Sequence, residues 1–422
     1  MKKRFAALAV AGAMTAALSL AGCGAQPPEE LRAADVQRVQ VNASDYAVQV
    51  RQLSDAALNL GAKLVAAGGD GNVVTSPASL LVALAMLRVG ASGATAAELD
   101  TVIGFPAAGR DEAMNAILAA LSTYDGDPAT VNEKEPPAKP VLHLADGLFV
   151  DRSQPPGKDY LRTLAAQYGA GVFPVDFLDK AATKPRIDAW VSRNTGGRIK
   201  EAPAEYRPDN TFSLLNSAFF AAAWQTPFSA DSTHNAGFTT VRGDKIQVPM
   251  MNGVISAKYA TGPDWQAIDI PYRDGFVMRL VLPAPGSAPS PAPARAREVA
   301  AALDAAQPAA VELSLPKWDH KSTADLEPVL KAMGLTVTLG PDADFHLIQD
   351  TMTITAAAQA ANITVAEKGT VAAAVSQLNG MAVSGRTAVA PLKLSVDRPF
   401  SYQILQLDGA LPLFMGQVTD PR

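Results

Sequence analysis

The sequence predicts an α+β fold. Helical patterns dominate the first half of the 422-residue chain and short strands the second half, with no regular alternation of strand and helix. No internal repeat is evident, and one extended sheet is able to organise a chain of this length as a single large domain. With 48% hydrophobic residues, 18% charged residues and a net charge of −5, the composition is globular and gives no reason to expect nucleic acid as a partner.

The elements of the first half follow from local patterns. Apolar residues recur at helical spacing over 46–67, and the glycine-rich run after them predicts a turn. Ser76 suits the N-cap of a buried helix that has Pro77 at its first position and ends at Gly90 and Gly93. Further helices are predicted at Thr95–Leu99, at Glu112–Leu121 and over a run ending in DAWVSRNTGG, and strands over VLHLADGLFV and FSLLNSAFFAAAW.

The second half is predicted as short strands with two helices. FTTV, IQVPMM, WQAIDIPY and FVMRLVLP lie close together, and the linker APGSAPSPAPARA separates them from a helix at Glu298–Leu303. A helix at Leu326–Met333 follows, and the strand-like runs around it are AAVELSLPKW, MTITAAAQAANITVAE, PLKLSV, FSYQILQL and LPLFMGQV. One segment, VAEKGTVAAAVSQLNGMAVSGRTAV, fits neither class, because it is small, uncharged between Lys368 and Arg386, and without clear periodicity.

The N-terminus predicts export. Three positive charges precede an apolar run over residues 5–20 that is short for a membrane span and suits a secretory signal. The run ends in Leu-Ala-Gly-Cys23, which is similar to a bacterial lipobox, and Cys23 is the only cysteine of the chain. We therefore expect a lipoprotein signal peptide over 1–22, a lipidated N-terminus and polar tether over 23–44, and an extracytoplasmic location on the outer face of the bacterial cell membrane.

The sequence lacks the residue patterns typical of metal sites and of common classes of enzyme. The four histidines, His143, His234, His320 and His346, lie far apart with no spacing typical of a metal site, so neither a metal nor a cofactor is predicted. No GxSxG elbow and no HExxH motif occurs, and the single cysteine is expected to be acylated. We therefore do not expect an enzyme.

Eight separated segments point to one family. They are NVVTSPASLLVALAMLRVGASGATAAEL, DAWVSRNTGGRIKE, LLNSAFFAAAWQTPF, VPMMNG, VELSLPKW, AEKGTVAAA, RPFSYQIL and LPLFMGQVTDP. Their order and approximate spacing resemble those of the serpins from about Tyr46 to the C-terminus. The resemblance implies one serpin domain over 45–422, with a large central mixed β-sheet, two further sheets, about nine helices and an exposed reactive-centre loop at about 367–392.

The resemblance also implies a mechanism. Inhibitory serpins present this loop as bait, and the target protease cleaves it and forms an acyl-enzyme. The hinge side of the loop then inserts into the central sheet as a new strand, and the protease is distorted so that the ester is not hydrolysed.

The hinge residues agree with such an insertion. A segment that enters a sheet interior carries no charge on its inward face, because burying an unpaired charge costs on the order of several kcal/mol or more. Alternate residues share a face, and Thr370, Ala372, Ala374 and Ser376 form a small one. By resemblance the hinge comprises Glu367, Gly369, Thr370, Ala372, Ala373 and Ala374, with Gly369 providing backbone freedom.

Two bonds are candidates for cleavage. Counted from Glu367, the spacing typical of inhibitory members places the reactive bond between Val383 and Ser384, and a small aliphatic Val suits the pocket of an elastase-like protease. The alternative is Arg386-Thr387, which would attract trypsin-like proteases. The loop is longer than in compact members, which leaves both bonds open.

Other positions match residues that control sheet opening in the family. Ser76, Ser79 and Asn216 match a polar cluster under the central sheet, and Trp224 matches the aromatic residue where the hinge first inserts. Gln359 stands where the family usually has a histidine, and an amide there is still able to bond Asn216. Val371 replaces a usual acidic residue, which leaves the insertion rate open.

The leading hypothesis is a surface-anchored, suicide-type serine protease inhibitor that acts as a monomer on an elastase-like or subtilisin-like target. The helix around Glu112 lacks a basic stripe, so no heparin-type cofactor is expected. One alternative is a non-inhibitory serpin that serves as a binding or transport module. Another is an inhibitor of papain-like cysteine proteases.

Overall fold

The computed structural model describes residues 25–132, 135–202, 211–370, 391–406 and 411–422. The described part contains eight α-helices and two β-sheets, so the expected α+β class is confirmed, with one helix fewer than the expected nine or so. The signal peptide, Cys23 and most of the reactive-centre loop lie outside the described residues.

The helices gather mainly in the first half of the chain. None of those described is both long and apolar enough to cross a membrane. The predicted buried helix is confirmed as α2, in which Ser76 caps the N-terminus and every residue from Pro77 to Leu87 is buried. The bounds are α1 Ala47–Ala67, α2 Pro77–Val89, α3 Gly93–Ile103, α4 Arg110–Leu121, α5 Lys158–Thr163, α6 Lys180–Asn194, α7 Pro293–Ala305 and α8 Glu327–Met333.

The central sheet has six strands in the order β10-β11-β12-β4-β2-β3. Most neighbours are antiparallel, but β11 also pairs directly and in parallel with β4, and β2 is parallel to β3, so the sheet is mixed as expected. The bounds are β10 Trp318–Asp325, β11 Ala356–Ala366, β12 Gly369–Thr370, β4 Phe212–Ala223, β2 Val141–Asp151 and β3 Phe173–Val175.

The other two sheets implied by the resemblance are joined into one. The long strand β6 pairs with β7 at its C-terminal end and with β5 and β9 over the rest, so that one strand belongs to both halves. The order is β1-β15-β14-β8-β7-β6-β9-β13, with β5 also on β6. The bounds are β1 Val73–Thr75, β5 His234–Thr239, β6 Lys245–Thr261, β7 Trp265–Pro271, β8 Phe276–Pro283, β9 Ala309–Pro316, β13 Leu392–Ser395, β14 Phe400–Gln406 and β15 Pro412–Val418.

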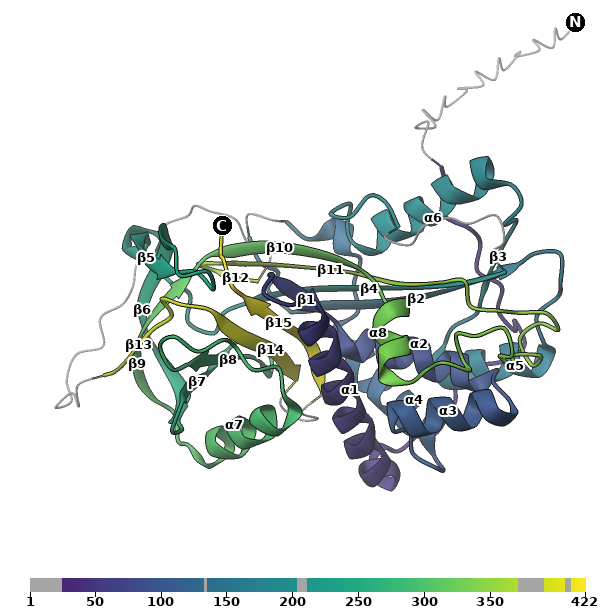
Figure 1. Ribbon diagram of the computed structural model, residues 1–422, viewed down its shortest axis with the longest axis horizontal. Coiled ribbons are helices and arrows are strands. Elements are labelled where there is room, and N and C mark those ends of the chain that lie inside the picture. The colour runs from purple at the N-terminus through teal and green to yellow at the C-terminus, as the bar shows by residue number, and fades with distance from the viewer. Residues whose placement is uncertain (1–24, 133–134, 203–210, 371–390, 407–410) are drawn as a thin grey trace, which may run out of the picture.

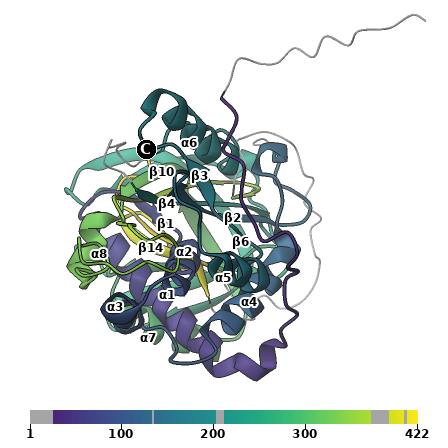
Figure 2. The ribbon, with the colours of Figure 1, turned by 90° about the vertical axis from the view of Figure 1, so that its right-hand side faces the viewer.

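Helices cover both faces of the central sheet. In Figure 1 its long strands run along the molecule, and Figures 1 and 2 both show α6 over one face and the cluster of α1 to α5 on the side of the other. On the α6 side, Ile187 and Trp190 pack with Phe149 and Leu215 of the sheet. On the other side, α2 shares the main core with β4, β14 and β15. Strand β4 is therefore buried along its whole length, which agrees with its mainly apolar sequence.

Some element bounds differ from the sequence-based predictions. Gly93 does not end α2 but is the first residue of α3, and its positive φ of 53° suits glycine. Helix α7 begins at Pro293, inside the predicted linker. Strands β1 and β10 were not predicted. The pattern of β10 is mostly polar because Asp319 and Lys321 are exposed while Trp318 and His320 face the interior.

The described part of the predicted tether lies against the domain. Leu31 pairs with Val172, exchanging two backbone hydrogen bonds of 2.7 and 3.0 Å. Arg38 donates to the Oδ1 atom of Asn115, and the Asn115 amide donates to the carbonyl of Val39. The residues following the expected lipid anchor are thus held by α4 and by the segment before β3, and do not form a free leader.

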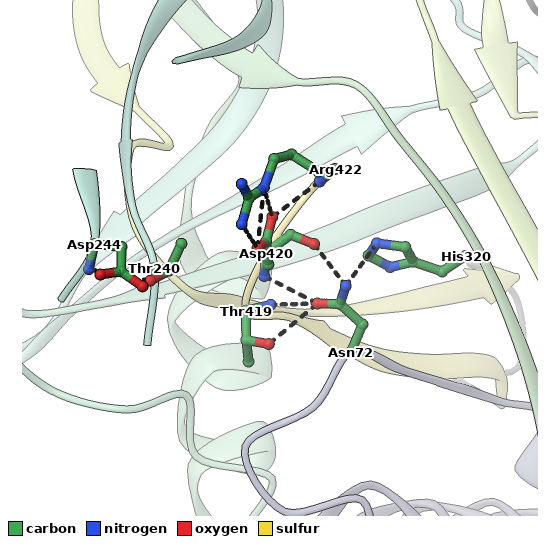
Figure 3. A network of polar contacts seen from close by, with 7 residues as sticks. All are labelled: Asn72, Thr240, Asp244, His320, Thr419, Asp420 and Arg422. Atoms are coloured by element: carbon green, nitrogen blue, oxygen red, sulfur yellow. Dashed lines mark hydrogen bonds and ion pairs between the residues drawn. The ribbon is translucent and has the colours of Figure 1, made fainter. Parts of the chain in front are cut away.

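The C-terminal tail is fixed by Asn72, as Figure 3 shows. Its Oδ1 accepts from the backbone N–H of Thr419 and Asp420, and its Nδ2 contacts the His320 Nε2 atom at 2.9 Å. Burial lowers the pKa of His320, which favours the neutral ring. Asn72 therefore links His320 on β10 to the C-terminal residues through hydrogen bonds.

Candidate functional site

The candidate site is the line along which strands β11 and β4 meet in the central sheet, called the gap here because a further strand, β12, lies between them at one end. From Ala356 to Ala361 the two strands pair directly, in parallel, and no strand lies between them there. At the other end β12, Gly369–Thr370, lies between them and pairs antiparallel with both. Two residues on the hinge side of the predicted loop, Gly369 and Thr370, thus form part of the central sheet.

Gly369 is required by a close approach of two backbones. Its φ is 155°, and a Cβ atom there would lie 2.1 Å from the carbonyl oxygen of Ala222 on β4. The sequence predicted a glycine that gives the hinge freedom. The structure gives a different reason, because only glycine lets β12 pair with β4 at this point.

Thr370 is fully buried and ends the described part of the hinge. Its hydroxyl is hydrogen-bonded to the Tyr272 hydroxyl. Burial raises the pKa of Tyr272, so the phenol is neutral and able to take part as donor or acceptor. Tyr272 was missed by sequence reasoning, since only the fold brings it to the hinge.

Trp224 joins the base of the hinge to β4. Its ring stacks on Tyr272 with centroids 4.2 Å apart. Its indole Nε1 donates to the carbonyl of Ala366 at 2.9 Å, and its backbone N–H donates to the carbonyl of Lys368 at 2.9 Å. Its expected place beside the first inserted residues thus agrees with the geometry.

Glu367 is held by a charged partner. Lys317 lies 2.9 Å from its carboxylate, and the Thr233 hydroxyl donates to it at 3.0 Å. Burial by itself would raise the pKa of Glu367, but the hydrogen bonds from Lys317 and Thr233 outweigh it and lower the pKa below the ordinary value. Glu367, the first residue of the hinge, is therefore ionised and is held in place by Lys317 and Thr233.

The closed end of the gap carries a network of buried polar groups. Gln359 on β11 donates to the Asn216 Oδ1 atom on β4 at 2.6 Å, as the sequence allowed. The same amide accepts from the Ser76 N–H at 3.0 Å and donates to the Ser76 carbonyl at 2.9 Å. Asn216 in turn donates to the Ser79 hydroxyl. The structure therefore brings Ser76, Ser79, Asn216 and Gln359 together.

Asp146 belongs to this network and was missed in the sequence. It lies on β2 opposite Asn216 and accepts a hydrogen bond from the Asn216 Nδ2 atom. Burial raises its pKa to about 7, although the hydrogen bonds from Asn216 and Ser79 act in the opposite direction. An acid inside an otherwise apolar strand pattern, LADGLF, was the available signal.

The other predicted site residues lie outside the described part of the chain. They are the hinge alanines, both candidate reactive bonds and the lipidation site: Ala372, Ala373, Ala374, Val383, Ser384, Arg386, Thr387 and Cys23.

Comparisons with known proteins agree on one family. The family model described as Serpin (serine protease inhibitor) matches residues 51–421. Human neuroserpin is 29% identical over 87% of this chain and 91% of its own length, and rat alpha-1-antiproteinase is 26% identical over 92% and 94%. Among solved structures, the thermophilic serpin tengpin in the native state superposes with a TM-score of 0.79 at 22% identity, covering 93% of this chain and all of that one. Human thyroxine-binding globulin complexed with thyroxine superposes with a TM-score of 0.75 at 24% identity, covering 89% of this chain and 99% of that one.

Proposed function

The chain belongs to the serpin family, and on that premise we propose that it is a surface-anchored, suicide-type inhibitor of serine endopeptidases. Serpins are typically protease inhibitors and not enzymes, and some members are non-inhibitory. The single observation that favours inhibition is β12, because the hinge already occupies the first two positions of the gap that an inserted loop would fill.

The register of β12 supports further insertion. Thr370 lies opposite Ala222 on one side and Val365 on the other. Continued in the same register, residue 376 falls opposite 216 and 359. Ser376 would then lie between Asn216 and Gln359, where its hydroxyl could replace the bond between these two amides. In that register the side chains on the same face as Thr370 would be those of Ala372, Ala374 and Ser376, which are small and uncharged.

In the proposed mechanism, the protease serine attacks the carbonyl carbon of Val383 and the amine of Ser384 leaves as the new N-terminus. The ester that remains joins the protease to the hinge side of the loop. Insertion would replace the direct pairing of β11 with β4 by two pairings, one between the loop and each of these strands, and this would release free energy. That free energy would displace and distort the protease before water hydrolyses the ester.

Val383, the small residue before the proposed reactive bond, favours an elastase-like or subtilisin-like protease, which is the partner we propose. Cleavage at Arg386-Thr387 would instead select trypsin-like proteases, and papain-like cysteine proteases are a further class. The lipobox-like sequence ending in Cys23 supports a lipid anchor on the outer face of the bacterial membrane, where the inhibitor, as a monomer, would meet exported or foreign proteases.

The test is incubation with elastase, subtilisin, trypsin and papain, followed by denaturing electrophoresis and mass spectrometry of the released C-terminal peptide. We expect an SDS-stable complex with elastase or subtilisin and a peptide that begins at Ser384. V383D should abolish this complex and the matched variant R386Q should preserve it; the reverse pattern would assign the second bond. Complete turnover of the loop without a complex would contradict inhibition and favour a binding or transport module.

A further inference from the structure

Asp146 completes a chain of hydrogen bonds that crosses three strands of the central sheet. The chain runs from Gln359 on β11 to Asn216 on β4 and on to Asp146 on β2. Asp146 is half-buried, and it lines a cavity of about 350 Å³ between β2, α2, α4 and α6. The carboxyl is thus buried enough to interact strongly and remains within reach of protons.

The direction of this chain is fixed at its β11 end. The Oε1 atom of Gln359 accepts from the Ser76 N–H, which is able only to donate, so its Nε2 atom must be the one that faces Asn216. Asn216 must therefore present its Oδ1 atom to Gln359. Its Nδ2 atom is left facing the Ser79 hydroxyl and the Asp146 carboxyl, both at 2.5 Å.

The carboxylate of Asp146 is the strongest acceptor available to Asn216. A hydrogen bond to an ionised acceptor is roughly twice as strong as one to a neutral acceptor. Protonation would leave a neutral carboxyl, which accepts less strongly and also donates, so it no longer requires that the amide nitrogen of Asn216 face it. Burial places this change near neutral pH, since it raises the pKa of Asp146 to about 7.

Opening of the gap would break the hydrogen bond between Asn216 and Gln359 without changing how deeply Asp146 is buried. Insertion parts β11 from β4 and breaks the bond between Gln359 and Asn216. The β2–β4 pairing, which carries Asp146, lies on the other edge of β4 and is not part of the gap. The cost of burying the carboxylate is therefore similar in the closed and open sheets, and only its effect through Asn216 differs.

We propose that Asp146 is a positioning residue whose ionised carboxylate holds Asn216 in the orientation that keeps β11 paired with β4, so that the sheet opens faster as pH falls through neutrality. This inference rests on the proposed function, since it concerns the rate of loop insertion. Asp146 would act through Asn216 and touch neither the loop nor the protease.

Other charged groups face the same cavity and must be separated from Asp146. His143, also on β2, contacts the Asp125 carboxylate at 2.8 Å and the Asn194 Oδ1 atom at 2.9 Å, so its ring is engaged away from Asp146. The lining residues from α2, α4 and α6 are uncharged. The titratable and charged groups that line the cavity with Asp146 are Glu30, Arg32 and Arg38 of the N-terminal segment, Asp125, His143 and Tyr168.

The rate of sheet opening is measurable without a protease. A peptide of residues 371–383, VAAAVSQLNGMAV, acetylated and amidated, carries no titratable group and matches the segment that would follow β12. Its rate of annealing to the full-length protein is followed by native electrophoresis between pH 5.5 and 8.5. We expect the wild-type rate to rise about fivefold from the alkaline to the acidic end.

Matched variants identify the group that causes the pH dependence of the annealing rate. D146N is neutral at every pH, so it should anneal at the fast rate throughout, while H143Q should keep the wild-type profile. D146S retains a neutral acceptor and replaces D146N if that variant does not fold. A pH-independent wild-type rate, or an unchanged profile in D146N, overturns the role of Asp146 while leaving insertion intact. Absence of annealing at every pH overturns both this role and the proposed insertion.

Discussion

The two ends of the gap between β11 and β4 are held in different ways. At the hinge end, two loop residues already lie in the sheet and are fixed by an ion pair, a stacked tryptophan and a buried hydroxyl contact. At the closed end the strands pair directly, and neutral amides join them through Gln359 and Asn216. In the proposed mechanism, insertion would begin at the first end, and the second end contains the bonds that further insertion would have to exchange.

The largest effect is expected from a charge at the hinge end. T370R places a guanidinium where the threonine is fully buried, and burying an unpaired charge costs on the order of several kcal/mol. Insertion should then be slower than hydrolysis of the acyl-enzyme, and the fraction of protease trapped should fall at least about tenfold. The measurement is the ratio of SDS-stable complex to cleaved inhibitor. T370S, which keeps the hydroxyl, should inhibit nearly as well as the wild type.

Loss of the amide at the closed end is expected to have the next largest effect. Gln359 makes hydrogen bonds to Thr75, Ser76 and Asn216, so Q359A leaves several buried groups unpaired. We expect a loss of about 3 kcal/mol in the free energy of unfolding and faster peptide annealing. Q359H restores an aromatic donor and should recover part of both. A Q359A variant of wild-type stability, measured by urea denaturation, would show that these bonds do not close the sheet.

At Gly369 the expected effect is smaller and local. G369A adds a Cβ atom 2.1 Å from the Ala222 carbonyl at a φ that alanine rarely adopts. The variant should lose β12 at a cost of about 2 kcal/mol, since residues held in such regions cost roughly 1–3 kcal/mol. Hydrogen exchange at Thr370 measures this directly. Protection of that amide equal to wild type would contradict the pairing described for β12.

The smallest effect concerns the pH dependence of the ion pair between Glu367 and Lys317. The pKa of Glu367 is lowered in the folded state, so its contribution to stability is present above the ordinary pKa of 4.5 and is lost as pH falls through the lower folded value. E367Q should cost about 1 kcal/mol at pH 7 and progressively less as the pH falls below the ordinary pKa and through the lowered folded value. Thermal melts over this range, with K317M as the matched variant, test the sign. A cost that grows on acidification would contradict the ion pair.

Much of the fold was predictable because its elements carry local signals. The apolar run after Ser76 and Pro77 specified α2, and the mainly apolar sequence of β4 specified a buried strand. Strand β10 was missed because only its alternate residues are buried, and the docking of the N-terminal segment because its partners, such as Asn115 and Val172, are remote in sequence.

The site was predictable where the family motifs name a residue, and not where folding alone supplies the partner. Gln359 and Asn216 were expected to meet and do. Tyr272 follows β7, Lys317 lies between β9 and β10, and Asp146 is on β2, so only the fold brings them to the site and no local pattern marked the first two. Only Asp146 carried a signal of its own, as an acid within an apolar strand.

The most direct test of the account is the thermal stability of the protein before and after cleavage within residues 371–390. If the sheet is poised to accept the loop, cleavage should raise the melting temperature sharply, into the hyperstable range above about 90 °C, because the inserted strand pairs on both sides. The rise should be largely absent in T370R. An unchanged or lower melting temperature in the cleaved wild-type protein would contradict insertion, and with it the proposed inhibitory mechanism.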